Sequence, residues 1–149
     1  MKRQVISACI NNQILVLSTI MTGVDLSAYK DLYLQTARKY LVDMSAALTA
    51  LQSDKTKKES IETMYISAHS LKSQSQIMTF ALTGALSGTI EFLFRDIREG
   101  KAQISDETLQ HLQNALQKLT ASIDSIEKNN QEMDLNQDIS TMKQFTGIS

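Results

Sequence analysis

Apolar side chains recur every three or four residues along most of the chain, which is the spacing of amphipathic helices. The stretch from about Leu26 to Ser53 carries one continuous apolar stripe, formed by Tyr33, Ala37, Leu41, Met44, Leu48 and Leu51. At 1.5 Å per residue, this stretch predicts a helix about 40 Å long. Residues 54–59 are polar and charged, which predicts a short loop between antiparallel neighbours.

A second helix is predicted from about Lys57 to Met78. Its apolar positions are Ile61, Met64, Tyr65, Ala68, Leu71 and Met78. His69 lies about 100° around the helix from Ala68, at the edge of the apolar stripe. Because no glycine or proline follows the stripe directly, the sequence does not fix where this helix ends.

Two more helices follow. The first is predicted over about Leu82 to Glu99, with Gly100 at the position of a left-handed C-cap. The second begins after Ser105, a residue type that favours the N-cap. Its core face is formed by Leu109, Leu112, Leu116, Leu119, Ile123 and Ile126. Four helices with short connectors predict an all-α fold, an antiparallel up-down four-helix bundle over residues 25–130.

Both ends of the chain lie outside this pattern. Residues 1–24 form an N-terminal extension whose apolar residues suit a short helix over residues 4–21, ended by Gly23. Such a helix is either a packing extension or a docking or self-association element. Residues 131–149 are more polar, with scattered apolar side chains, so a C-terminal helix and a frayed tail are both open.

The composition supports one helical domain. The chain has 149 residues, 42% of them apolar, and contains neither proline nor tryptophan, which suits a single core of helices. A net charge of −1 gives no electrostatic signal for nucleic acid or an anionic membrane. Cys9 is the only cysteine, so no intramolecular disulfide can form, and no apolar run has the roughly 18–20 residues of a membrane span. We therefore expect a cytoplasmic monomer that binds neither nucleic acid nor membrane.

His69 is the first candidate for chemistry. An imidazole at the margin of a core face, with Lys72 one turn along the helix, suits a nucleophile that carries a negatively charged group. A lone histidine in such a position is more often a packed or solvated bystander. The spacing alone therefore leaves both interpretations open.

The residues around His69 resemble a known family. Residues 68–72 read Ala-His-Ser-Leu-Lys and residues 78–80 read Met-Thr-Phe, which resembles the signature of histidine-containing phosphotransfer (HPt) domains. The likeness continues through residues 92–105 and covers roughly residues 29–129, and it is nearest to the amino-terminal phosphotransfer domain of chemotaxis-type histidine kinases. The resemblance implies that His69 is the phosphoacceptor and that Glu91, on the next helix, orients its ring. It also implies that Lys72 supplies positive charge to the phosphoryl group.

The helix that carries Glu91 has an unusual stripe beside its apolar face. Gly84, Gly88, Glu91 and Arg95 fall within about 60° of one another on a helical wheel. Each glycine inside a helix costs about 0.8–1 kcal/mol relative to alanine. Two of them on one stripe indicate a close approach, either of a tightly packed helix or of the imidazole edge.

Four positions depart from the family pattern. Ser73 and Thr79 stand where the family usually has glycine; the small serine keeps His69 accessible, whereas the threonine leaves the turn geometry open. Gln76 replaces a small residue, so its amide could crowd a docking receiver or hydrogen-bond the phosphoryl oxygens. Gly88 stands where the nearest relatives carry a second histidine.

The resemblance predicts a phosphotransfer module that accepts phosphate on His69 and passes it to the aspartate of a response-regulator receiver. Its partners would be a histidine kinase and that receiver, with magnesium on the receiver and no cofactor or metal on this chain. The sequence has no ATP-binding motif, so we expect no autonomous kinase activity. The alternatives are a catalytically silent HPt-like docking module and a helical protein whose match is accidental. His111 is expected to face solvent and not to be a second phosphorylation site.

Overall fold

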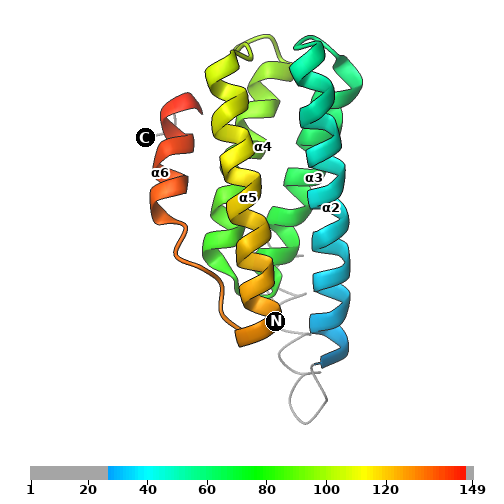
Figure 1. Cartoon of the computed structure of the whole chain (residues 1–149), viewed down its shortest axis with the longest axis vertical. Helices are drawn as coiled ribbons and strands as arrows, with labels where there is room; N and C mark the ends of the chain where they lie inside the picture. Colours follow the sequence, from blue (N-terminus) through cyan, green and yellow to red (C-terminus); the bar gives the residue numbers. More distant parts are fainter. Residues whose placement is uncertain (1–26, 147–149) are drawn as a thin grey trace, which may run out of the picture.

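The computed structural model describes residues 27–146. Helices are the regular elements of this part of the chain: α2 (Ser27–Ser53), α3 (Lys58–Ile77), α4 (Ala81–Arg98), α5 (Asp106–Asn129) and α6 (Asn136–Thr146). Figure 1 shows α2 to α5 side by side with nearly parallel axes, and α6 along the outside of α5. The predicted N-terminal extension, residues 1–24, lies outside the described residues.

Helices α2 to α5 form the predicted bundle. Helix α2 packs against α3 and α5, and α4 packs against α3 and α5, so each helix of the bundle has two neighbours. Short connectors reverse the chain direction at each step. The prediction of an all-α, antiparallel up-down four-helix bundle is confirmed.

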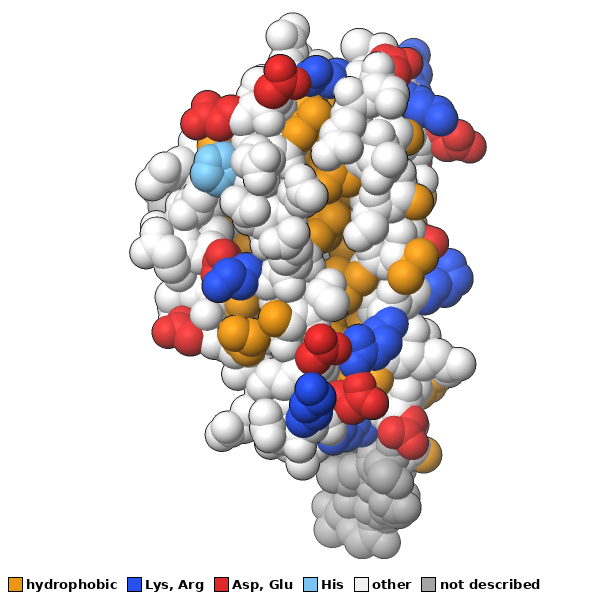
Figure 2. Space-filling model, in the orientation of Figure 1, with side chains coloured by type: hydrophobic (Ala, Val, Ile, Leu, Met, Phe, Trp, Pro, Cys, Tyr) orange, Lys and Arg blue, Asp and Glu red, His pale blue; other side chains and the backbone are white. Residues whose placement is uncertain are grey.

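The apolar stripes face the centre of the bundle. The largest side chains in the core are fully buried and come from all four helices: Phe94, Met44, Leu51, Met64, Leu71, Leu86, Ile90, Leu93, Leu112, Leu119, Ile123 and Ile126. The face drawn in Figure 2 is mostly polar, and apolar side chains show mainly along the lines between helices. Burial of these stripes is the main stabilising contribution to the fold.

Small polar side chains are buried among the apolar ones and find partners inside the bundle. The hydroxyl of Tyr33 on α2 lies 2.8 Å from Oγ of Ser75 on α3. Burial raises the pKa of Tyr33 to about 12. Within residues 27–146, every buried side-chain nitrogen or oxygen has a hydrogen-bond partner, as expected for a well-packed interior.

Helices α3 and α4 end in the same way. The amide of Phe80 donates to the carbonyl of Ser75, and the amide of Thr79 donates to the carbonyl of Gln76. This is the Schellman arrangement, which requires a left-handed residue after the helix. Thr79 has φ 68°, and Gly100 occupies the matching position after α4 with φ 77°. The left-handed cap predicted at Gly100 is observed. At Thr79, where the sequence did not decide the turn geometry, the backbone adopts the left-handed conformation that glycine favours.

The ends of α4 and α5 are held by specific side chains. Ser105 is the N-cap of α5, where its Oγ accepts a hydrogen bond from the Thr108 amide at 3.0 Å. The N-terminus of α4 is capped from a distance, because Glu132 accepts hydrogen bonds from the amides of Leu82 at 3.0 Å and Thr83 at 2.7 Å. A carboxylate at the positive end of a helix is stabilising.

Glu132 belongs to the connector that leads into α6. Of the two possibilities left open for residues 131–149, a helix over Asn136–Thr146 is what the structure shows. Leu135, Ile139 and Met142 are buried where this segment packs on α4 and α5. None of the described helices combines the length and apolar character needed to cross a bilayer.

His111 on α5 differs from the sequence-based expectation. It is half-buried, and its ring lies 4.7 Å from the ring of Phe145 on α6, measured between centroids. The expectation of a solvent-facing side chain was wrong because α6 packs along α5 and covers this flank.

Candidate functional site

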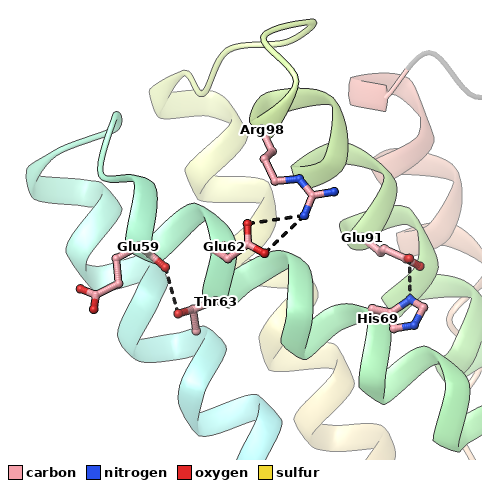
Figure 3. A network of polar contacts seen from close by, with 6 residues as sticks. All are labelled: Glu59, Glu62, Thr63, His69, Glu91 and Arg98. Carbon is pink, nitrogen blue, oxygen red and sulfur yellow. Dashed lines mark hydrogen bonds and ion pairs between the residues drawn. The ribbon is translucent and has the colours of Figure 1, made fainter.

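The candidate site lies on the outer surface of the α3–α4 pair. These antiparallel helices pair in one constant register. A residue that lies further along α3 faces a residue that lies equally far back along α4. Four facing pairs define this register: Glu62 with Arg98, His69 with Glu91, Lys72 with Gly88, and Gln76 with Gly84. Figure 3 shows the first two of these pairs.

The register places the imidazole of His69 against the carboxylate of Glu91. Nδ1 of His69 lies 2.7 Å from Oε2 of Glu91, and the two side chains point toward each other from neighbouring helices in Figure 3. The His69 side chain is 53% exposed, whereas that of Glu91 is only 14% exposed. An exposed ring is thus anchored at one edge by a largely buried acid.

Glu91 has a second partner on α3. Nζ of Lys72 lies 2.6 Å from Oε1 of Glu91. Burial acts to raise the pKa of Glu91, but the hydrogen bonds and positive charge of Lys72, together with the contact to His69, outweigh it and lower this pKa below its ordinary value. Glu91 is therefore ionised at neutral pH.

The ionisation of Glu91 determines the tautomer of His69. An ionised carboxylate has only acceptor atoms, so Nδ1 of His69 must carry the proton of the hydrogen bond. The lone pair of the neutral ring then lies on Nε2. Within residues 27–146, no side chain or backbone group hydrogen-bonds this Nε2. The site therefore presents an exposed imidazole with a free nucleophilic nitrogen.

The two glycines of α4 make room for side chains of α3. A Cβ atom at Gly88 would lie 3.2 Å from Cδ of Lys72, and one at Gly84 would lie 3.1 Å from Cγ of Gln76. The close approach that the glycine stripe predicted is real. It comes from Lys72 and Gln76 and not from the imidazole edge, because the register brings these side chains across α4. Gly88 thereby lets the lysine stem pass toward Glu91.

The other predicted site residues lie around this centre. Ser73 is half-buried and Gln76 is exposed. Tyr65, which the sequence placed in the apolar stripe, stacks on His69 with 6.3 Å between ring centroids and 17° between ring planes. No cluster of three or more potential metal ligands occurs in the part of the chain that the structure describes.

Comparison with known proteins identifies the family of the chain. The sequence model of the Hpt domain family matches residues 28–122. The chain belongs to the Hpt domain family. The matched residues of this Hpt domain include α3 and α4 and thus His69, Lys72 and Glu91.

The curated relatives are much longer proteins. This Hpt domain is similar to the chemotaxis protein CheA of Bacillus subtilis, at 26% identity over 102 residues, and to CheA of Halobacterium salinarum, at 21% identity over 99 residues. These matches cover 68% and 66% of this chain, respectively, but 15% of each relative.

Two solved structures share the fold. The solution structure of the histidine phosphotransfer domain of CheA superposes with a TM-score of 0.74 at 19% identity, covering 84% of this chain and 96% of that one. The phosphorylated P1 domain of CheA3, in complex with CheY6 from R. sphaeroides, gives a TM-score of 0.70 at 19% identity, covering 79% and 92%. The match of the family model to residues 28–122 excludes an accidental resemblance.

Proposed function

We propose that this Hpt domain accepts a phosphoryl group on Nε2 of His69 and passes it to the aspartate of a response-regulator receiver. The observation that carries the proposal is the contact between Nδ1 of His69 and the ionised Glu91 at 2.7 Å. This contact keeps the proton on Nδ1 and leaves Nε2 as a free nucleophile on an exposed ring.

The reaction would run as a direct exchange. Nε2 attacks the phosphorus of the donor, a new N–P bond forms, and the bond from phosphorus to the donor's carboxylate oxygen or imidazole nitrogen breaks. The ring then keeps its proton on Nδ1 and carries positive charge, which the Glu91 carboxylate stabilises. In the second transfer, an aspartate oxygen of the receiver attacks and the His69 ring leaves neutral.

Lys72 would supply positive charge beside the phosphoryl group. In the described structure its ammonium group is bound to Glu91, one turn along α3 from His69. Lysine acts as a compact charge on a flexible stem, so a short movement of this stem would bring it toward phosphoryl oxygens on Nε2. The proposed role thus needs no rearrangement of the helices.

The proposed partners are a histidine kinase and a receiver. One of the similar structures is a complex with the receiver CheY6, and the curated relatives are CheA proteins. We place magnesium on the receiver, where it would assist transfer to the aspartate. That the chain acts as a cytoplasmic monomer stays a prediction.

The proposal is tested by mixing the chain with a chemotaxis receiver that has been charged with acetyl phosphate, or with an active CheA kinase. We expect a label on the chain that is lost in acid and stable in base. The label disappears in His69→Gln and remains in His111→Gln, the matched control at the other histidine. Tight binding without any label would instead support the silent docking module.

A further inference from the structure

Beyond Glu91, the imidazole of His69 has a second support, which comes from its own helix. Tyr65 lies one turn before His69 on α3, and the two rings are nearly parallel, at 17° and 6.3 Å between centroids. This distance is within the range of offset-stacked aromatic pairs. Tyr65 is half-buried, so its ring is itself partly fixed by packing.

A cation from the neighbouring helix holds Tyr65. The guanidinium carbon of Arg98 on α4 lies 3.9 Å from the centroid of the Tyr65 ring, within the distance of a cation–π contact. Arg98 is also paired with Glu62 on α3, with 3.3 Å between Nη1 and Oε2. Along α3, Tyr65 therefore lies between the facing pairs Glu62–Arg98 and His69–Glu91. Figure 3 shows these two pairs.

A single hydrogen bond does not fix an imidazole. The torsion between Cβ and the ring has a broad, roughly two-fold energy profile in histidine. Glu91 holds the ring at Nδ1, which leaves the ring plane free to rock about that contact. A stacking neighbour restricts this motion, and phosphoryl transfer depends strongly on how the attacking atom is positioned.

We propose that Tyr65 is a positioning residue that fixes the plane of the His69 imidazole, and that Arg98 holds Tyr65 in place for this purpose. The consequence for transfer rests on the proposed function, whereas the effect on the ring itself does not. Among the described residues, Tyr65 contacts His69 through its ring and makes no hydrogen bond to it.

The first experiment measures the order of the His69 ring in the free protein by carbon-13 relaxation. Tyr65→Leu removes the stacking ring but keeps an apolar side chain, and Tyr65→Phe keeps the ring without its hydroxyl. We expect the order parameter of the His69 ring to fall in Tyr65→Leu and to stay at the wild-type value in Tyr65→Phe. Equal order in both variants would overturn the proposal, whatever the outcome of any transfer assay.

The second experiment compares two phosphoryl donors. With a receiver charged with acetyl phosphate, whose phosphorus is held in a fixed docked geometry, Tyr65→Leu should slow phosphorylation of His69 about two- to tenfold, the range expected for loss of one aromatic pair. With phosphoramidate, a small donor that reaches Nε2 from any direction, we expect the rate to stay within about twofold. The phosphorylation of free imidazole by phosphoramidate under the same conditions is the reference for the reactivity of this donor.

The role of Arg98 has a matched control one turn away. Arg98→Gln should lower the order of the His69 ring in the same direction as Tyr65→Leu. Arg95→Gln also removes one positive charge that lies over an aromatic ring of α4, in this case Phe92 at 4.3 Å, and should leave the order of the His69 ring unchanged. Equal order of the His69 ring in the two variants would overturn the role of Arg98 in holding Tyr65.

The two hypotheses fail in different ways. A wild-type chain that takes no phosphate from any receiver or kinase would contradict the proposed function, while the relaxation measurement would still decide the role of Tyr65. A wild-type chain that transfers phosphate, together with a Tyr65→Leu variant that transfers equally fast and keeps an ordered ring, would overturn only the positioning role.

Discussion

The Nδ1 atom of His69 and the Oε2 atom of Glu91 lie 2.7 Å apart across the α3–α4 interface. The acid comes from the helix that follows the histidine helix, and its other oxygen is occupied by Lys72. Because the exposed ring is held at Nδ1 by a largely buried carboxylate, Nε2 is the nitrogen that is left to accept the phosphoryl group. The contact with Glu91 thus accounts for both the accessibility and the orientation of the nucleophilic nitrogen.

Removal of the Glu91 carboxylate should weaken this orientation. We expect Glu91→Ala to slow phosphotransfer about three- to tenfold, because a hydrogen bond worth about 1 kcal/mol is lost. Nitrogen-15 NMR should show a second His69 tautomer in the variant. Glu99→Ala removes an exposed carboxylate at the end of the same helix and serves as the control. A transfer rate within twofold of the wild type would show that Glu91 does not orient the ring.

The left-handed backbone conformation of Thr79, directly after α3, leads to a prediction about the stability of the fold. Thr79 has φ 68°, and a β-branched side chain in this conformation is strained. Thr79→Gly should therefore raise the free energy of unfolding by about 1 kcal/mol. Gly100→Thr, at the matching position after α4, should lower it by a similar amount. Chemical denaturation measures both, and a destabilised Thr79→Gly would mean that the threonine side chain makes a compensating contact.

The remote cap of α4 is open to a similar test. Glu132 accepts two backbone hydrogen bonds at the start of the helix that carries Glu91. Glu132→Ala should lower the free energy of unfolding by about 1–2 kcal/mol, the cost of losing a helix cap. Gln131→Ala, at an exposed position in the same connector, should change it by less than about 0.5 kcal/mol. Equal effects of the two substitutions would rule out a specific capping contribution.

The buried hydroxyl of Tyr33 predicts a loss of stability at alkaline pH. Burial raises its pKa from 10.0 to about 12, so the folded state disfavours the tyrosinate that forms in the unfolded chain. The stability contribution is complete below pH 10.0 and is lost as the pH rises through about 12. The change should reach about 2–3 kcal/mol.

Tyr33→Phe should flatten this part of the pH profile of unfolding. The tyrosinate absorbance that disappears in the variant assigns the titration to Tyr33, and Tyr29→Phe is the control for the loss of one tyrosine from α2. A profile of Tyr33→Phe that falls as steeply as that of the wild type would contradict the assignment.

The apolar spacing was sufficient to predict the bundle. The first three predicted helices begin and end within one or two residues of the observed ones, as for the stretch predicted from Lys57 to Met78 and observed as Lys58–Ile77. The fourth begins directly after Ser105, as predicted. Stripes of this length can be buried in few other ways. The family resemblance added Glu91 as the partner of His69, and the structure brings these two residues together.

Other features depend on register and could not be predicted. The passage of Lys72 over Gly88 requires knowing which residues of α3 and α4 face each other. The same holds for Arg98 over Tyr65. The cap by Glu132 joins segments far apart in the sequence, and a periodicity within one helix carries no information about such contacts.

We expect phosphate to be carried on Nε2 of His69, and the site of attachment can be observed directly. The chain would be phosphorylated by an active CheA kinase or by a receiver charged with acetyl phosphate, and then studied by phosphorus-31 and nitrogen-15 NMR. We predict one phosphoryl group, on Nε2 of His69, with the Nδ1 proton still hydrogen-bonded to Glu91. A phosphoryl group on Nδ1 or on another residue, or no phosphorylation by either donor, would contradict the account.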